Sequence, residues 1–147
     1  MRAKDKVVII TGAGSGIGEA TARLFVQEGA TVVLSDINQS AIDKTASGLE
    51  GAEVIVTDVS KHDQVETLIT ETVSKFGKLD VMINNAGIGP KEMNKTAEHT
   101  YEDWDSVIAV NQTGVFYCMK MALAQMTEQG YGNIVNDYFF GNNGNWK

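Results

Sequence analysis

The sequence predicts an α/β fold, a doubly wound parallel sheet with helices on both faces. Short β-branched runs bounded by glycines alternate with segments whose apolar residues recur at helical spacing. Strands that alternate with helices of this length pair in parallel through right-handed crossovers. At 147 residues the chain has room for one domain with one core.

The first three elements are a strand, a helix and a strand. Residues 6–11, KVVIIT, are β-branched and too few for a helix, which indicates a buried strand. Apolar residues then recur at helical spacing from Ile17 to Phe25, and Gly29 ends that helix. The second strand is TVVLSD, which begins at Thr31.

The same pattern then repeats twice. We expect a helix over residues 39–49, a strand in AEVIVTDV at residues 52–59, and a helix with its apolar face between Val65 and Phe76. A fourth strand, LDVMINNAG, follows at residues 79–87.

A long helix and a fifth strand complete the alternation. The helix is expected from Tyr101 to Glu128, ended by Gly130, and GNIV at residues 132–135 forms the strand. Because this helix is apolar over a wide arc, it suits a second packing partner, and we expect self-association through it.

The composition changes after Asn136. The last twelve positions hold four of the eleven aromatic residues. We therefore expect a domain at residues 1–136 and an atypical tail at 137–147, which either forms a hairpin through Asn143 and Gly144 or is a loose terminus. Since doubly wound dinucleotide sheets have six or more strands, the sheet is expected to be truncated after its fifth strand.

Charge and composition exclude several classes of function. The net charge of -7 and the pI near 4.7 oppose binding to nucleic acid or to anionic lipid. No apolar run approaches the roughly 20 residues that span a bilayer, so we expect a cytoplasmic protein without a membrane partner. Cys118 is the only cysteine, and His62 and His99 lack ligand spacing, so no metal site is expected.

A glycine-rich turn, TGAGSGIG at residues 11–18, joins the first strand to the first helix. Gly12 is expected to allow the tight turn, Gly16 the close approach of a pyrophosphate, and Gly18 the packing of helix on sheet. Ser15 and Ile17 complete this predicted contact, because the N-terminus of the following helix offers free N–H groups to an anion. A flexible loop is the alternative.

Acidic residues follow the second and third strands. Asp36 is placed to accept hydrogen bonds from an adenosine ribose and to repel a 2′-phosphate, which favours NAD over NADP. Asp58 and Val59 are expected to meet the adenine. A helix cap is the alternative for both aspartates. Methyltransferases that use S-adenosylmethionine share such a turn and acid, so they remain open as an alternative.

Taken together, these motifs resemble those of short-chain dehydrogenases/reductases. Residues 11–18 match the family turn TGxxxGxG, residues 84–87 match its NNAG motif, and Asn111 is similar to its helix asparagine. The resemblance covers residues 4–136. It implies a Rossmann-like sheet and an NAD(P)-dependent oxidoreductase that acts on an alcohol/ketone pair.

The resemblance also assigns roles to residues of the fourth strand and the long helix. Asn85, Ala86 and Gly87 would border the cofactor. Asn111 would be a catalytic residue that holds a water in a proton relay, and its amide would alternatively, or also, be satisfied by nearby backbone.

The family's catalytic serine, tyrosine and lysine are not found in this chain. No tyrosine has a lysine four positions on, and no serine follows Ser106. We therefore expect the chain as given to bind a dinucleotide without turnover, since the acid that protonates the alkoxide is missing. A non-catalytic dinucleotide-binding module is the alternative function.

Overall fold

A computed structural model of the chain describes residues 1–92 and 94–137. Its centre is a five-stranded parallel sheet in the order β3-β2-β1-β4-β5. The strands are β1 (Val7–Thr11), β2 (Thr31–Asp36), β3 (Glu53–Val56), β4 (Val81–Asn84) and β5 (Asn133–Asn136). The predicted doubly wound α/β sheet is confirmed; the predicted hairpin and tail lie almost wholly outside the described residues.

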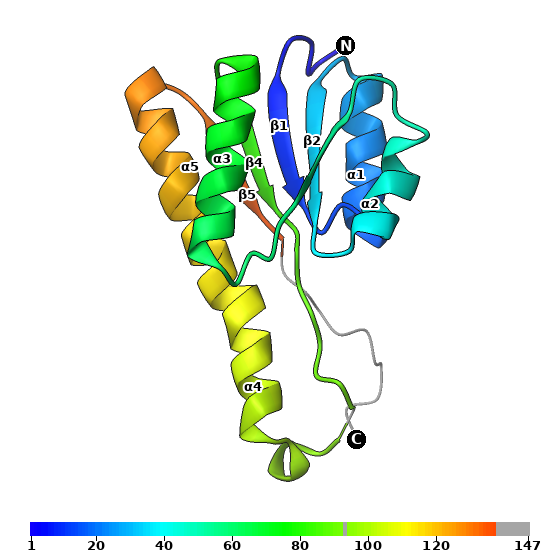
Figure 1. Ribbon diagram of the computed structural model, residues 1–147, viewed down its shortest axis with the longest axis vertical. Coiled ribbons are helices and arrows are strands. Elements are labelled where there is room, and N and C mark those ends of the chain that lie inside the picture. Colours follow the sequence, from blue (N-terminus) through cyan, green and yellow to red (C-terminus); the bar gives the residue numbers. More distant parts are fainter. Residues whose placement is uncertain (93, 138–147) are drawn as a thin grey trace.

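Helices cover both faces of the sheet, as Figure 1 shows. The helical elements are α1 (Gly16–Gln27), α2 (Gln39–Ala46), α3 (His62–Phe76), the 3₁₀ turn η1 (Thr96–Glu98), α4 (Tyr101–Ile108), the π-helical turn η2 (Ala109–Gly114) and α5 (Val115–Gln129). Helices α1 and α2 lie on one face, and α3 and α5 lie side by side on the other. Helix α2 ends three residues earlier than predicted, and β3 is shorter than the predicted strand.

Alternating residues of each strand feed the two cores. Ile9, Val33 and Met82 point towards α3 and α5, where they pack with Leu68 and Cys118. Cys118 is buried as a small apolar group, and burial raises the pKa of its thiol to about 12.

The other core lies between the sheet and helices α1 and α2. Val8, Ile10 and Leu34 meet Ala22 of α1 and Ile42 of α2 there, all fully buried. Because every strand of the centre is apolar on both sides, the parallel sheet is covered on both faces, as sheets of this type require.

The predicted long helix is one helical stretch with a π-helical turn, η2, inside it. Helix α4 projects beyond the end of the sheet (Figure 1) and has no buried residue. Trp104, Val107 and Ile108 form an apolar stripe at helical spacing. No layer of the described structure covers α4, and Trp104 is 66% exposed. Buried residues of the stretch begin at Gly114 and continue in α5.

The stretch Tyr101–Gln129 is long and apolar enough to cross a membrane by length and composition alone. One such helix is weak evidence, since core helices of other proteins pass the same test. Here Cys118, Ala122 and Met126 are buried against the sheet and α3, whereas Phe116 and Leu123 of the same helix are exposed.

The amino-terminal ends of the strands are held by Asp80, which is 3% exposed. Its carboxylate accepts hydrogen bonds from the Val7 backbone N–H at 2.9 Å and from Lys6 Nζ at 3.1 Å, and it pairs with Lys78. Burial opposes ionisation, but these hydrogen bonds outweigh it and lower the pKa of Asp80. Gln129 adds a second tie, because its side-chain amide bonds the backbone N–H and C=O of Leu79.

Candidate functional site

A cleft of about 540 Å³ opens at the carboxyl-terminal ends of the strands. In doubly wound sheets, ligands bind at this edge, where the strand order reverses between β1 and β4. Four strand ends and one helix supply its lining: Gly12 after β1, Asp36 and Ile37 after β2, Thr57 to Lys61 after β3, Ala86 to Ile88 after β4, and Asp105, Ser106, Ala109 and Val110 from α4 and η2.

The glycine turn has a backbone conformation in which residues other than glycine would be strained. Gly12 and Gly16 have φ of +65° and +56°, the left-handed region that favours glycine. A Cβ on Gly18 would clash with the Gly12 carbonyl oxygen and lie 2.6 Å from Nδ2 of Asn85. A Cβ on Gly14 would lie 2.7 Å from Cβ of Ala41. These glycines keep helix α1 and the turn close to the sheet.

Thr11 fastens the end of β4 to this turn. Its hydroxyl oxygen accepts the backbone N–H groups of Asn85 at 3.1 Å and Ala86 at 3.0 Å, and the hydroxyl donates to the Ile83 carbonyl. Asn85 in turn donates from Nδ2 to the carbonyl oxygens of Thr11 and Gly12. The NNAG segment thus holds the glycine turn from behind.

Asp36 stands at the end of β2 beside the turn. Its Oδ2 accepts the Gly14 backbone N–H at 3.1 Å, and its Oδ1 accepts the Asn38 backbone N–H at 3.0 Å. The N-cap of α2 is Asn38 rather than Asp36, because the Asn38 side chain accepts the Ala41 N–H. A carboxylate has about four acceptor sites, so Asp36 retains acceptor capacity towards the cleft.

Asp58 and Val59 form the wall of the cleft after β3. The carboxylate of Asp58 accepts both the backbone N–H and the hydroxyl of Ser60, at 2.9 Å and 2.7 Å, and closes a local turn. Asp58 does not cap α3, whose N-cap is Lys61. Val59 is buried against Gly114 of η2, where a Cβ would lie 2.8 Å from its Cγ2.

Asn111 lies in the π-helical turn, and its amide is bonded to backbone on both sides. Oδ1 accepts the Ile88 N–H and Nδ2 donates to the Ile88 carbonyl, each at 2.9 Å. This is the backbone-satisfied arrangement that the sequence left open. The side chain ties η2 to the segment after β4, at the side of the cleft.

The structure brings together in the cleft lining only some of the predicted contact residues: Gly12, Asp36, Asp58, Val59, Ala86 and Gly87. Ser15, Gly16, Ile17, Gly18 and Asn85 lie outside that lining, and Ile17 is 68% exposed. The sequence analysis did not single out Ile37, Thr57, Lys61 or the α4 residues. Lys61 lies two positions after Val59 in the strand-to-helix loop, next to the predicted pair Asp58 and Val59, whereas nothing in the sequence signals that α4 reaches the cleft.

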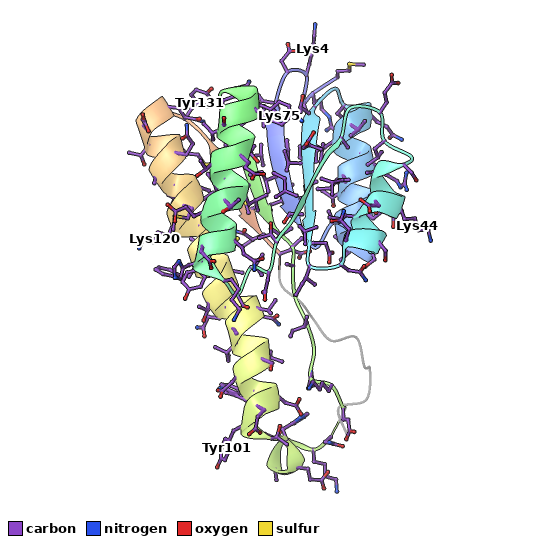
Figure 2. The ribbon with its side chains drawn as sticks, viewed as in Figure 1. Lys4, Lys44, Lys75, Tyr101, Lys120 and Tyr131 are labelled. Atoms are coloured by element: carbon purple, nitrogen blue, oxygen red, sulfur yellow. The ribbon has the colours of Figure 1, made fainter. Side chains whose placement is uncertain are left out.

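Tyrosine and lysine side chains do not gather at the cleft within the described part of the chain. No tyrosine lines it. Figure 2 shows Tyr101 at the free end of α4, Tyr131 beyond the end of α5, and Lys120 between them on α5. Among the described residues no group of three His, Cys, Asp or Glu is placed to hold a metal ion.

Known proteins match this chain over most of its length. The family model "short chain dehydrogenase" matches residues 6–137. The 3-oxoacyl-[acyl-carrier-protein] reductase of Thermotoga maritima is 44% identical over 140 residues, which are 92% of this chain and 56% of that protein. The meso-2,3-butanediol dehydrogenase of Serratia marcescens is 42% identical over 92% of this chain and 54% of its own.

A solved structure agrees with these relatives. The crystal structure of levodione reductase superposes with a TM-score of 0.84 at 41% identity, covering 90% of this chain and 54% of that one. The chain spans about half the length of the curated relatives it matches. Over that half, sequence motifs, sheet order and structural likeness agree: the chain belongs to the short-chain dehydrogenase family.

Proposed function

We propose that residues 1–136 form the NAD-binding domain of an oxidoreductase that acts on an alcohol/ketone pair. The observation that carries the proposal is the cleft at the carboxyl ends of the strands, bordered by the glycine turn and by Asp36 and Asp58. The names of the relatives fit it, since a butanediol dehydrogenase oxidises an alcohol and levodione reductase is named for reduction. When bound, the cofactor supplies or accepts the hydride.

The residues of the cleft fit a dinucleotide. Close packing at Gly12, Gly14 and Gly18 leaves room for backbone where side chains would clash, which suits the close approach of a pyrophosphate. Asp36 would hold the ribose hydroxyls through its remaining acceptor sites, and Asp58 with Val59 would meet the adenine. Ser15, Gly16 and Ile17, at the start of α1, would face the pyrophosphate.

NAD is preferred over NADP in this proposal. Among residues 1–92 and 94–137, the cleft is lined by three carboxylates, those of Asp36, Asp58 and Asp105, and by one cationic side chain, that of Lys61. A 2′-phosphate carries up to two negative charges beside these groups, and like charges in a narrow cleft repel.

Turnover is not expected of this sequence. The basis is that no tyrosine among residues 1–147 has a lysine four positions on, and that Asn111 already gives both ends of its amide to Ile88. We expect Asn111 to act by positioning the wall of the cleft, while a water held beside η2 stays a prediction. A cytoplasmic location and the absence of nucleic acid and membrane partners also stay predictions.

Titration calorimetry with NAD, NADP and S-adenosylmethionine tests the proposal on the full chain. We expect binding of NAD, at least tenfold weaker binding of NADP, and none of S-adenosylmethionine. Asp36→Ala should weaken the binding of NAD and reduce the preference for NAD over NADP. Asp43→Ala is the matched control, because Asp43 is an exposed aspartate of α2 that accepts a hydrogen bond from the Gln39 side chain, outside the cleft.

Two results would count against this function. Binding of S-adenosylmethionine in preference to NAD would indicate a methyltransferase cleft instead of a dinucleotide-binding one. NADH-dependent reduction of any carbonyl compound in a substrate panel, at a rate well above buffer, would contradict the expected lack of turnover while leaving NAD binding intact.

A further inference from the structure

Two buried side-chain atoms in the described part of the chain have no hydrogen-bond partner, Ser35 Oγ and Asn84 Oδ1. Asn84 lies next to β5, close to residues outside the described part, whereas Ser35 lies in β2 between the described strands β1 and β3. Ser35 is 0% exposed. Leaving a buried hydroxyl unpaired costs free energy, so such a group usually bonds to protein or to an ordered water.

The side chain of Ser35 points into the core between the sheet and helices α3 and α5. Val33, two residues earlier in β2, belongs to that core, and side chains two positions apart in a strand share a face. Ile55, the register partner of Ser35 in β3, packs against the same core. The Ser35 hydroxyl therefore lies among apolar side chains.

Thr11, the register partner of Ser35 in β1, is no partner for its hydroxyl. The hydroxyl oxygen of Thr11 already accepts the backbone N–H groups of Asn85 and Ala86, and its hydrogen is donated to the Ile83 carbonyl. Because a hydroxyl has one hydrogen to donate and two lone pairs that accept, that of Thr11 is fully used.

Thr57 has the capacity that Thr11 lacks. Its backbone N–H donates to the Asp36 carbonyl at 3.0 Å, so the ladder between β2 and β3 continues past Val56 and Thr57 shares the face of Ile55. Thr57 is 2% exposed, and its hydroxyl donates one long bond of 3.4 Å to the Ile55 carbonyl. Among the described residues, none donates to this hydroxyl oxygen.

Ser35 and Thr57 are diagonal neighbours on one face of the sheet, because Ser35 is in register with Ile55. Diagonal neighbours lie about 7–8 Å apart, which is too far for a direct bond between the two hydroxyls. One water spans such a gap with hydrogen bonds of about 2.8 Å to each oxygen. Two polar partners are also the least that a buried water needs.

We propose that a buried water molecule binds between Ser35 Oγ and Thr57 Oγ1 and joins the ends of β2 and β3. The water accepts a hydrogen bond from the Ser35 hydroxyl and donates one to Thr57 Oγ1. Asp36 and Asp58 directly follow these two residues in sequence, and Thr57 itself lines the cleft, so the water lies at the base of the cleft wall. The site is independent of the proposed function, since no cofactor contact enters it.

A high-resolution crystal structure of the full chain is the direct test. We expect a water within about 2.7–3.2 Å of both Ser35 Oγ and Thr57 Oγ1, and its loss from the structure of Ser35→Ala. A direct bond from Ser35 to a protein group, or an empty space between the two oxygens, would overturn the proposal.

Urea unfolding of Ser35→Ala gives a second test, because the sign of the effect separates a hydrated hydroxyl from a dry one. With the water bound, the substitution removes a hydrogen bond that is made, so the urea midpoint should fall. If the hydroxyl has no partner, the substitution removes a buried unpaired group and the midpoint should rise. A risen midpoint would overturn the proposal.

A double-mutant cycle in urea unfolding asks whether Thr57 shares the water. Ser35→Ala and Thr57→Val each remove one of its two partners, so the midpoint shift of the double variant should be smaller than the sum of the single shifts. Purely additive shifts would show that the two hydroxyls share nothing.

Thr45→Val is the matched control for this cycle. Thr45 is 1% exposed and lies in α2, on the other face of the sheet, where its hydroxyl donates to the Ala41 carbonyl of its own helix. Its shift should add to that of Ser35→Ala. Coupling of Ser35 to Thr45 as strong as that to Thr57 would contradict a water shared by Ser35 and Thr57.

Discussion

The two ends of the parallel strands are built on opposite principles. At the amino-terminal end, the buried carboxylate of Asp80 is matched by two lysines and a backbone N–H. At the carboxyl-terminal end, Asp36 and Asp58 take part in no ion pair with any described residue and are held by backbone and hydroxyl groups alone. At the amino-terminal end, the polar groups are bonded to one another and hold the sheet together. At the carboxyl-terminal end, the carboxylates keep acceptor capacity beside an open cleft.

The largest expected effect is at Gly18, at the carboxyl-terminal end of the strands, where there is no room for a side chain. Gly18→Ala places a methyl group against the Gly12 carbonyl and the Asn85 amide, so the turn has to move. We expect a loss of about 3 kcal/mol in the free energy of unfolding, in the range for overpacked buried sites, and loss of NAD binding. Urea unfolding and calorimetry measure the two effects.

Gly51→Ala is the control for this change. Gly51 has φ of +80° but open space around its Cα, so the substitution costs only backbone strain, about 1 kcal/mol. Equal losses in the free energy of unfolding for the two substitutions would show that close packing at Gly18 is not the cause of the effect.

Thr11→Val comes next, because it removes the acceptor shared by Asn85 and Ala86. Two backbone N–H groups then lose their partner in a partly buried place, and we expect a cost of about 2–3 kcal/mol in urea unfolding. Thr72→Val is the matched control: Thr72 is also fully buried, but its hydroxyl only donates to the Leu68 carbonyl of its own helix. A cost at Thr72 as large as at Thr11 would contradict this account.

Asp80→Asn tests the amino end. The charge-assisted bonds to Lys6 and Lys78 are lost, and we expect about 2 kcal/mol of destabilisation at pH 7 without a change in NAD affinity. Because the folded-state pKa of Asp80 is lowered, its contribution is complete above the unfolded pKa of about 3.9 and falls as pH drops through the folded pKa.

Unfolding of wild type and Asp80→Asn from pH 7 to pH 2 measures this dependence. The two proteins should differ most above about pH 5 and converge as the wild-type carboxyl protonates. A difference that stays constant down to pH 2 would mean that the charge of Asp80 is not the source of its effect.

The smallest effect is expected at Asn111. Asn111→Ala leaves the N–H and C=O of Ile88 without their partner, so we expect the free energy of unfolding to fall by about 1–2 kcal/mol. NAD binding should also weaken, because the wall of the cleft shifts. Gln112→Ala, the neighbouring exposed amide in the same turn, should change neither quantity. If both variants behave alike, the tie to Ile88 has no role in shaping the cleft.

The sequence predicted the sheet, because strand and helix periods are local and strong. Residues 6–11 and 31–36 have no competing interpretation, and Gly130 ends its helix, as predicted; its backbone there is left-handed. The motif residues of the cleft could be named for the same reason, since a turn such as TGAGSGIG is contiguous in sequence.

Features that depend on distant partners escaped prediction. The π-helical turn at η2 leaves no mark in the periodicity, and it rests on contacts of Asn111 with Ile88 and of Gly114 with Val59. The role of Asp80 is equally hidden, because Val7 lies 73 positions away in sequence. The exposure of α4 could not be read from its apolar stripe, since a stripe shows which face is apolar and not whether another element covers it.

The cleft is assembled from segments that lie far apart in the sequence: the ends of β1, β2, β3 and β4 and one side of α4. A ligand that contacts all of them is bound only when all of them are in place, so its binding free energy adds to that of folding. At a free cofactor concentration one hundred times the dissociation constant, this addition is about 2.7 kcal/mol. The lifetime of this chain in a cell would then follow the size of the cofactor pool, and the chain would be degraded fastest when the pool is depleted.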